Sequence, residues 1–386
     1  MFIKNITVIG MGFIGLPTAL LLANPKTLVN CIDINKDKIF QLKKGKLSTK
    51  EVAIKNLFNK KKKFLKFSDK ILKSNTYIVC LPTPTKKIDK FYYKQDLKII
   101  NKLFFQLEKI LKKNDLVIIE STCPPRTALN FYRKISKKIK FHVSTCPERA
   151  IPGSTISEMT NNSRIIGSSS NQAYKKTRMI YDKFVKGKIY RTSLVEAELI
   201  KLYENTFRDV NIALSAELQK IAEKYKVNSK KVFQLANLHP RVNFLKSGIG
   251  VGGHCIPVDP WFLIKRDKNS IIYNSRVINL KQEDKIFNKV SRIVIKKKNI
   301  LLFGITYKEN VDDIRNSPAL NIIKKIKRIN TKVNIFDPIN DCFNNINIKN
   351  LRKKNFDLLI VFVNHDWLKK NLINYKKKIV LKNFLI

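Results

Sequence analysis

Short apolar runs alternate with helix-like stretches along most of the chain, a pattern typical of α/β proteins. The first run, Ile3–Ile9, leads through a glycine-rich turn into an apolar helical stretch that continues to Ala23, and Leu28–Ile32 follows as a second strand. Further strands of the same kind are expected at 77–81, 116–119 and 141–144. We therefore expect a Rossmann-like domain with a parallel sheet over residues 1–190.

One long helix dominates the middle of the chain. Leu194–Tyr225 contains no glycine or proline, and apolar residues recur there at helical spacing, for a length of about 45 Å. Lys201, Asn205 and Arg208 are spaced by four and seven residues, which puts them on one face. A solvated face is the structural alternative, but Asn205 is an indifferent helix former in a strong helix, which indicates a retained use. We expect a helical domain over 191–295.

The last third of the chain has the pattern of a second α/β unit. Ser317 as N-cap, with Pro318 at the first helical position, predicts the start of a helix. No second glycine-rich fingerprint is present, so this unit could bind a nucleotide in another way or serve as scaffold. The expected fold class is α/β, with two Rossmann-like domains, 1–190 and 296–386, that have parallel sheets and are joined by the helical middle domain. Strands of the second one are expected at 299–303, 333–336, 358–363 and 379–381.

The turn after the first strand reads Gly10-Met-Gly12-Phe13-Ile14-Gly15, a dinucleotide-binding fingerprint. The first glycine makes the tight turn, the second lets the backbone approach a pyrophosphate, and the third lets the helix pack on the strand. The second strand ends in Asp33, which suits the ribose hydroxyls of NAD and would repel the 2′-phosphate of NADP. We therefore expect an NAD site, with Lys36 and Lys38 leaving NADP as an alternative.

Three of the expected strands deliver polar residues to one edge of the sheet, where ligands bind in open α/β folds. Ordinary strand-to-helix turns with capping Ser and Thr are the structural alternative. The segments in question are Pro82-Thr83-Pro-Thr85, Glu120-Ser-Thr122 and Cys146-Pro-Glu148-Arg149.

The stretch Gly248–Pro260 is rich in glycine and carries Cys255 and Asp259. A thiol on a rigid loop beside a carboxylate suits covalent catalysis at a carbonyl. The alternative, a buried cysteine in a glycine-rich turn, is the usual fate of a lone cysteine. The four glycines before His254 and the two prolines around Asp259 favour catalysis, with only a minor part for His254 itself.

Composition fits a soluble protein. At 386 residues, with 44% hydrophobic and 27% charged residues, the chain has room for two or three domains. No apolar stretch is long enough to span a membrane, and the N-terminus lacks the apolar core of a signal peptide. The six cysteines form no Cys-x-x-Cys pair, which favours reduced thiols in the cytoplasm and indicates no metal site.

The formal net charge of +48 has three explanations. Abundant Lys, Ile and Asn, spread along the chain, favour compositional drift first. Attraction of an anionic substrate by the field of the protein is the second. Nucleic-acid binding is the third, because no binding motif accompanies the short lysine runs Lys60–Lys63 and Lys296–Lys298.

The loop around Cys255 resembles the catalytic-cysteine loop of the UDP-glucose/GDP-mannose 6-dehydrogenase family, and the resemblance covers nearly the whole chain. The Pro-Trp pair after Asp259 and the segment 236–243 are similar to the acetamido-sugar branch. The resemblance implies a four-electron oxidation of C6 of a nucleotide sugar with two NAD, through a thiohemiacetal and a thioester on Cys255. It also implies a homodimer formed through the central helix and a UDP moiety held by the C-terminal domain.

Roles for individual residues follow from the resemblance. Lys201 and Asn205 would stabilise the oxyanion, and Asp259 would act as the base. Glu148 would assist the hydrolytic water, and Thr122 would hydrogen-bond near the reacting carbon. The implied cofactor site comprises Gly10, Gly12, Phe13, Ile14, Gly15, Asp33, Pro82, Thr83, Thr122 and Arg315. The implied sugar-nucleotide site comprises Glu148, Arg149, Lys201, Asn205, Arg208, His239, Arg241, Gly252 and Lys308.

The chain departs from the family pattern at three places. Pro125-Arg126 stand where a glycine is usual nearby, the loop Cys146–Gly153 lacks the second glutamate of the UDP-glucose enzymes, and Lys-Asn-Phe-Leu-Ile replaces the usual ending. We expect UDP-N-acetyl-D-mannosamine as the preferred substrate, ahead of UDP-GlcNAc and UDP-glucose, with GDP-mannose open, for surface-polysaccharide precursors. A β-hydroxyacid dehydrogenase, which would not require Cys255, and a basic nucleic-acid-binding protein are the alternatives.

Overall fold

The computed structural model describes residues 5–295, 297, 299–371 and 373–381. The chain forms two compact units, one made of 1–88, 93–203 and 261–263, the second of 89–92, 204–260 and 264–386. The unusual ending, 382–386, and the first two residues of the expected Ile3–Ile9 strand lie outside the described residues.

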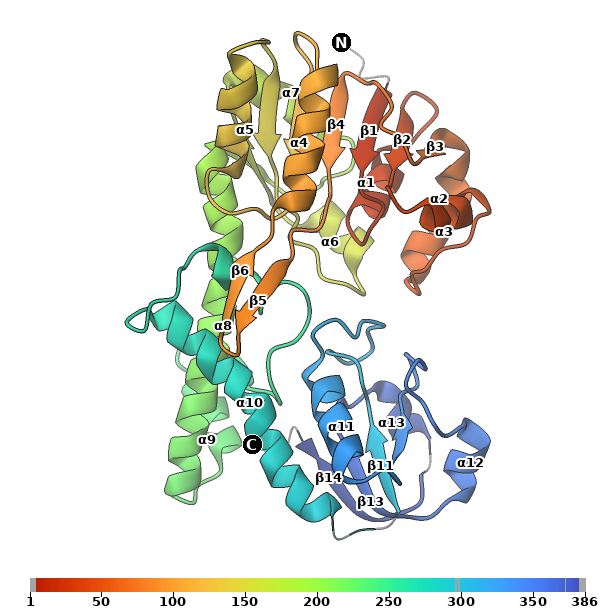
Figure 1. Ribbon diagram of the computed structural model, residues 1–386, viewed down its shortest axis with the longest axis vertical. Coiled ribbons are helices and arrows are strands. Elements are labelled where there is room, and N and C mark those ends of the chain that lie inside the picture. Colours follow the sequence, from red (N-terminus) through yellow and green to blue (C-terminus); the bar gives the residue numbers. More distant parts are fainter. Residues whose placement is uncertain (1–4, 296, 298, 372, 382–386) are drawn as a thin grey trace. The chain divides into compact units, whose positions relative to one another are not determined.

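The first unit is built on an eight-stranded sheet with the order β10-β9-β8-β7-β4-β1-β2-β3 (Figure 1). Neighbouring strands are parallel except β8 and β9, which are antiparallel. The strand order reverses between β1 and β4, which is where open α/β sheets bind their ligands. The strands are β1 Asn5–Ile9, β2 Leu28–Ile32, β3 Leu65–Ser68, β4 Thr76–Val79, β7 Leu116–Ile119, β8 His142–Thr145, β9 Arg164–Ser168 and β10 Ile189–Thr192.

Apolar side chains cover both faces of this sheet. Successive strand residues point to opposite sides, so one strand contributes to two apolar clusters. On β4, Ile78 joins one apolar cluster with Leu20, whereas Tyr77 and Val79 join another with Leu103. A separate two-stranded sheet, β5 Thr85–Asp89 and β6 Tyr92–Gln95, follows β4 in the chain. The helices are α1 Gly15–Leu22, α2 Lys36–Lys43, α3 Val52–Lys61, α4 Lys98–Ile110, α5 Thr127–Ser136, α6 Thr155–Asn161 and α7 Asn171–Tyr181, with a 3-10 turn η1 at Lys62–Phe64.

Helix α8, Leu194–Lys224, begins in the first unit and continues into the second. Its 31 residues agree with the helix expected over 194–225, since nothing in that stretch breaks the backbone ladder. The second unit continues with α9 Ser229–Ala236 and α10 Ile271–Val294. Between these helices lies the 3-10 turn η2, Asp259–Phe262, whose last two residues belong to the first unit.

The C-terminal part of the second unit is a four-stranded parallel sheet with the order β12-β11-β13-β14. Helix α11 begins as expected, because Ser317 Oγ accepts the N–H of Leu320 and Pro318 occupies the first turn. The elements are β11 Ile300–Phe303, α11 Pro318–Ile329, β12 Asn334–Phe336, α12 Ile348–Lys353, β13 Phe356–Val361, α13 Asp366–Lys370 and β14 Tyr375–Val380.

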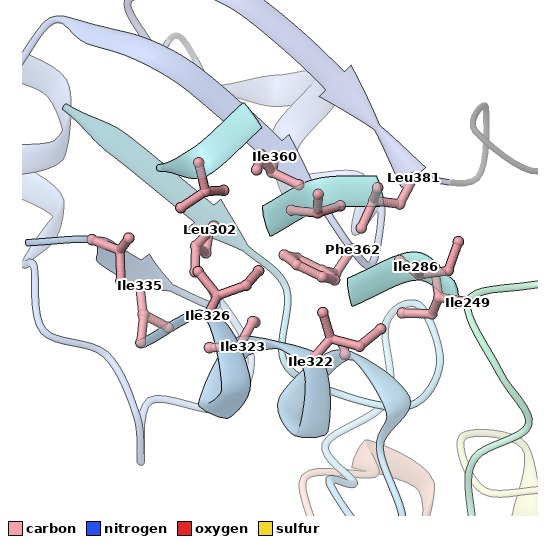
Figure 2. Close-up of a cluster of buried hydrophobic side chains, with 14 of the residues drawn as sticks. Ile249, Ile286, Leu302, Ile322, Ile323, Ile326, Ile335, Ile360, Phe362 and Leu381 are labelled. Carbon is pink, nitrogen blue, oxygen red and sulfur yellow. The ribbon is translucent and has the colours of Figure 1, made fainter. Parts of the chain in front are cut away.

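The glycine-rich loop is anchored in the core of this second unit. Ile249 lies in the same buried cluster as Ile286 of α10, Ile322 of α11 and Ile360 of β13 (Figure 2). An apolar side chain at the start of the loop therefore fixes the backbone that leads to Cys255.

The α/β class with parallel, Rossmann-like sheets is confirmed. Three strands of the first sheet, β3, β9 and β10, were not expected from the sequence. No residue of β3 is fully buried, a buried arginine opens β9, and the two central residues of β10 are exposed. Within the described part of the chain, no helix combines the length and the apolar character needed to traverse a bilayer.

Candidate active site

The glycine turn after β1 has the close approaches that the fingerprint predicts. Gly10 adopts φ +101°, and a Cβ there would lie 2.4 Å from the carbonyl oxygen of Cys80. A Cβ on Gly15 would lie 1.7 Å from the carbonyl oxygen of Gly10. Beside Gly12, in contrast, a Cβ would meet nothing within 4 Å, and Phe13 and Ile14 complete the turn. This open backbone fits the pyrophosphate of a dinucleotide.

Asp33 lies at the end of β2 and is tied to the glycine turn. Its Oδ2 accepts the N–H of Met11 at 3.0 Å, and its Oδ1 accepts the N–H of Asn35 at 3.0 Å. Lys38 forms an ion pair with Oδ2 at 2.8 Å, with its own side chain 40% exposed. Lys36 is exposed. The residue that should select NAD therefore has a cation beside it, which gives the NADP alternative a physical basis.

The loops that follow β4 and β7 are joined by hydrogen bonds. The Thr83 hydroxyl, one residue after Pro82, donates to the carbonyl oxygen of Thr122 at 2.5 Å. The N–H of Leu81 donates to Ser121 Oγ at 2.8 Å. The polar residues that the strand pattern assigned to one edge thus do lie together.

The loop after β7 is also fixed to α8 by a buried acid. Glu198 accepts the N–H of Arg126 at 2.7 Å and the N–H of Ala128 at 2.8 Å. Burial raises the pKa of Glu198 to about 7, although both N–H bonds act in the opposite direction. Glu198 lies three residues before Lys201, so this contact fixes the start of α8 relative to the loop that carries Thr122. Glu198 was not expected from the sequence, where an acid among apolar helix positions was the available signal.

The loop after β8 carries Glu148, whose carboxylate accepts several hydrogen bonds. Glu148 Oε1 accepts the N–H groups of Arg149 and Ala150 at 2.7 and 2.9 Å. Its Oε2 forms an ion pair with Arg164, the first residue of β9. The guanidinium of Arg149 donates to the carbonyl oxygen of Ser163 at 3.0 Å, so Arg149 itself braces the loop.

Helix α8 presents the expected polar residues in two different environments. Lys201 and Asn205 are buried, with 8% and 4% of their surface exposed, whereas Arg208 is exposed. A purely solvated face is therefore wrong for Lys201 and Asn205. The amide of Asn205 donates to Oδ2 of Asp259 at 2.6 Å.

Cys255 is exposed, so the alternative of a buried structural cysteine is wrong. Its carbonyl oxygen accepts the N–H groups of Val258 and Asp259 at 3.0 and 2.9 Å. The thiol and the Asp259 carboxylate therefore belong to one tight turn, and Asp259 is 3% exposed.

Residues 307–318 clamp the cysteine loop. The N–H of Gly253 donates to the carbonyl oxygen of Arg315 at 3.1 Å, and the Asn316 amide donates to the carbonyl oxygen of Gly253 at 2.9 Å. A Cβ on Gly252 would lie 2.7 Å from Cδ of Pro318 and 2.8 Å from Cβ of Tyr307. Glycine at 252 is thus needed for this close packing, a structural reason beside its expected contact with substrate.

Charged groups lie beside the cysteine loop. Asp313 holds the Arg315 guanidinium, with Nε 3.0 Å from Oδ1 and Nη2 2.7 Å from Oδ2. Burial lowers the pKa of Arg315, but the charges of Asp313 and Cys255 outweigh it, so this pKa is raised. Burial, with Asp313 and Cys255, raises the pKa of Tyr307 to about 12. Burial and the charge of Arg315 lower the pKa of His254. Arg315 therefore brings a positive charge that interacts with Cys255.

Lys308, expected at the sugar nucleotide, is exposed. Its loop is held by three buried residues, Thr306, Asp337 and His365. Thr306 Oγ1 donates to the carbonyl oxygen of Lys308 at 2.9 Å and lies 3.2 Å from Nε2 of His365. Asp337 accepts the N–H of Ile305 at 2.7 Å and contacts the same histidine nitrogen at 3.1 Å. The sequence analysis did not single out His365 or Asp337.

His239 and Arg241 lie on the exposed segment after α9, where the N–H of Arg241 donates to His239 Nδ1 at 3.3 Å. Their expected contact with substrate stays a prediction.

Comparison with known proteins agrees with this geometry. The NAD binding, central and UDP binding domains of the UDP-glucose/GDP-mannose dehydrogenase family match residues 4–185, 195–283 and 301–386.

Individual relatives are similar over almost their full length. The UDP-N-acetyl-D-mannosamine dehydrogenase of Methanocaldococcus jannaschii is 39% identical, across 99% of this chain and 93% of that protein. The solved UDP-D-ManNAc dehydrogenase of Pyrococcus horikoshii is 33% identical, with a TM-score of 0.86 over 98% of this chain and 94% of that one. The UDP-N-acetyl-mannosamine dehydrogenase of Staphylococcus aureus is 31% identical, with a TM-score of 0.87 over 98% and 95%. With its dinucleotide turn and its exposed cysteine on a clamped loop, the chain belongs to the UDP-glucose/GDP-mannose dehydrogenase family and is an NAD-dependent dehydrogenase of nucleotide sugars.

Proposed function

We propose that the chain oxidises C6 of UDP-N-acetyl-D-mannosamine to the carboxylate through a covalent thioester on Cys255. The observation that carries this proposal is the turn that joins an exposed thiol to a buried Asp259, itself bonded to Asn205. The whole reaction converts one alcohol, two NAD⁺ and one water to one carboxylate, two NADH and three protons.

The residues divide the work as follows. Asp259 takes the hydroxyl proton as C6 becomes an aldehyde, and NAD, when bound, accepts the two electrons and the hydrogen lost from carbon at each oxidation. The Cys255 thiolate then adds to the carbonyl, forming a C–S bond while the carbonyl electron pair moves to oxygen. Lys201 and the Asn205 amide stabilise that oxyanion.

The second oxidation converts the thiohemiacetal to a thioester. Water then forms a bond to the acyl carbon, and the C–S bond breaks with its electron pair returning to sulfur. Glu148 assists this water, and the cation of Arg315 stabilises the departing thiolate. Thr122 lies near the reacting carbon in this proposal.

The choice of sugar rests on the relatives and on one loop. The three relatives compared above carry the name of the N-acetylmannosamine enzyme. The loop Cys146–Gly153 lacks a second carboxylate that would bind ring hydroxyls, which leaves room for the N-acetyl group. UDP-GlcNAc and UDP-glucose are the alternative substrates, and the product would serve as a surface-polysaccharide precursor.

We also propose a homodimer formed through the central helix. Phe207, Leu214 and Ile221 are exposed on α8 at intervals of seven residues, which makes one apolar stripe. The working arrangement is an NAD domain over 1–190, a helical domain over 191–295 and a UDP domain over 296–386. Cys31, Cys80, Cys123, Cys146 and Cys342 are free thiols, which suits the reducing cytoplasm.

The test is a panel of nucleotide sugars at fixed NAD⁺, with NADH and product measured together. UDP-N-acetyl-D-mannosamine should give the highest kcat/KM, with UDP-GlcNAc second and UDP-glucose lower by on the order of 10²-fold. UDP-glucose equal to or better than the N-acetylated sugars would overturn the choice of sugar. Binding of a random DNA duplex is measured at increasing salt concentration, and the duplex should not inhibit oxidation of any of these sugars. Salt-dependent DNA binding without NAD binding would favour the nucleic-acid alternative.

A further inference from the structure

A buried arginine joins two carboxylates in the first unit. Arg164, at the start of β9, has a side chain that is 6% exposed, and its guanidinium lies 4.4 Å from the ring centre of Tyr181. Nη2 forms an ion pair with Glu148 Oε2, and Nη1 lies 3.5 Å from Glu120 Oε1. A planar guanidinium can address two carboxylates at once, which the point charge of a lysine does less well. The shorter contact makes Glu148 the principal partner.

Glu120 has its own set of donors. Its Oε1 accepts the hydroxyl of Tyr181 at 2.6 Å, and its Oε2 accepts the hydroxyl of Thr18 at 2.9 Å. Burial raises the pKa of Glu120, Arg164 lowers it and Glu148 raises it again. Glu120 therefore does not need Arg164 for its hydrogen bonds, and the cation is available to hold Glu148.

The acceptor positions of Glu148 are almost filled. Two backbone N–H groups occupy Oε1 and the guanidinium of Arg164 occupies one position on Oε2. An ionised carboxylate has about four lone-pair sites, so about one remains for a water or a hydroxyl group. The loop cannot easily shift, because Glu51 accepts the N–H groups of Gly153 and Thr155 at 2.8 and 3.2 Å.

We propose that Arg164 is the positioning residue for thioester hydrolysis: it holds Glu148 in one orientation, so that one remaining lone pair aligns the attacking water. This inference rests on the function proposed above. In the step itself, the water oxygen bonds to the acyl carbon and the C–S bond breaks to give the Cys255 thiolate. The proton of the water passes to Glu148 and on to solvent. Arg164 itself touches no reacting atom.

The test separates hydrolysis from the two oxidations. Enzyme is mixed rapidly with NAD⁺ and UDP-N-acetyl-D-mannosamine, and the burst of NADH is compared with steady-state turnover. Arg164→Lys and Arg164→Met should keep a burst of two NADH per site, while turnover divided by burst amplitude falls by on the order of 10²-fold. The sugar adduct on Cys255 should accumulate in the intact-protein mass spectrum. Unfolded enzyme lowers burst and turnover together, so this ratio still reports hydrolysis if a variant is unstable.

Two further variants show whether the effect runs through Glu148. Tyr181→Phe removes a donor to Glu120 but keeps the aromatic ring beside Arg164, and it should retain the wild-type ratio. Glu148→Gln/Arg164→Lys should be no slower than Glu148→Gln alone, because the second change has nothing left to position. The role of Arg164 would be overturned if the losses of hydrolysis from Glu148→Gln and Arg164→Lys were additive in the double variant. It would also be overturned if the Arg164 variants had the wild-type ratio of turnover to burst amplitude and accumulated no adduct. Failure of the proposed function looks different: wild-type enzyme would then give no two-NADH burst with any nucleotide sugar, and both proposals would fall.

Discussion

The amide of Asn205 donates to Oδ2 of Asp259 at 2.6 Å, and both side chains are buried. An amide nitrogen carries two hydrogens, so Asn205 can hold the base with one and offer the other to an oxyanion. In the proposed mechanism the base and the oxyanion donor are therefore one hydrogen-bonded pair, and a change in either should affect both steps of the reaction.

Asn205→Ala should lower kcat by about 10²–10³-fold and the free energy of unfolding by about 1–3 kcal/mol, because it removes an oxyanion donor and a donor to a buried carboxylate. The matched control is Thr206→Val, because the buried Oγ1 of Thr206 has no hydrogen-bond partner among the described residues. Steady-state kinetics and urea unfolding of both variants check this. Equal losses in the two variants would show that general packing, and not the Asn205–Asp259 pair, is responsible.

Cofactor selectivity should depend on Asp33 and Lys38 together. Asp33→Ala leaves the Lys38 cation without its carboxylate partner, so the kcat/KM for NADP⁺ should rise relative to that for NAD⁺. Asp33→Ala/Lys38→Ala should use NADP⁺ less well than the single variant. If wild-type enzyme uses both cofactors equally, Asp33 does not select against the 2′-phosphate.

Arg126 occupies the left-handed region, with φ 73°, just before α5. A non-glycine residue in this region lowers the free energy of unfolding by about 1–2 kcal/mol. Glycine avoids this strain, but its greater conformational entropy in the unfolded chain lowers stability by about 0.5–1 kcal/mol. Arg126→Gly should therefore increase the free energy of unfolding by about 1 kcal/mol. Lys137→Gly, at the other end of α5 with φ −64°, is the control and should destabilise. Urea denaturation measures both variants, and a loss of stability in Arg126→Gly as large as that in Lys137→Gly would contradict the account of strain.

Glu198 should make stability depend on pH. Its pKa is about 7 in the folded chain, raised by burial from the ordinary 4.5. Between these values the folded state keeps a proton that the unfolded state releases, so stability falls as pH rises from about 4.5 to 7 and then levels off. Glu198→Gln cannot ionise, so wild type should lose on the order of 1–3 kcal/mol relative to this variant across that window. Parallel stability curves for the two proteins would show that Glu198 does not titrate there.

Local motifs were the most predictable part of this chain. The glycine turn depends on backbone conformations set by neighbouring residues, and it has the close approaches that the sequence predicts. Asp33 follows the last residue of β2, as expected. The long helix α8 and the start of α11 also follow from local composition and capping.

The residues that support the site could not be predicted in this way. Arg164 reaches Glu148 from a neighbouring strand, and Glu198 reaches the loop after β7 from α8, about 70 residues away in the chain. Such pairs depend on strand order and helix packing, which no short window of sequence contains. The clamp of residues 307–318 on Gly252 and Gly253 is of the same kind.

The number of NADH molecules formed per sugar tests the central claim most directly. Wild-type enzyme with limiting UDP-N-acetyl-D-mannosamine should yield two NADH for each uronate, because the thiohemiacetal on Cys255 keeps the aldehyde bound until the second oxidation. Cys255→Ser should still carry out the first oxidation, and it should then either release the aldehyde with one NADH or, after a second oxidation, accumulate a slowly hydrolysed ester. One NADH per sugar from the wild type, or full turnover by Cys255→Ser, would contradict covalent catalysis at Cys255.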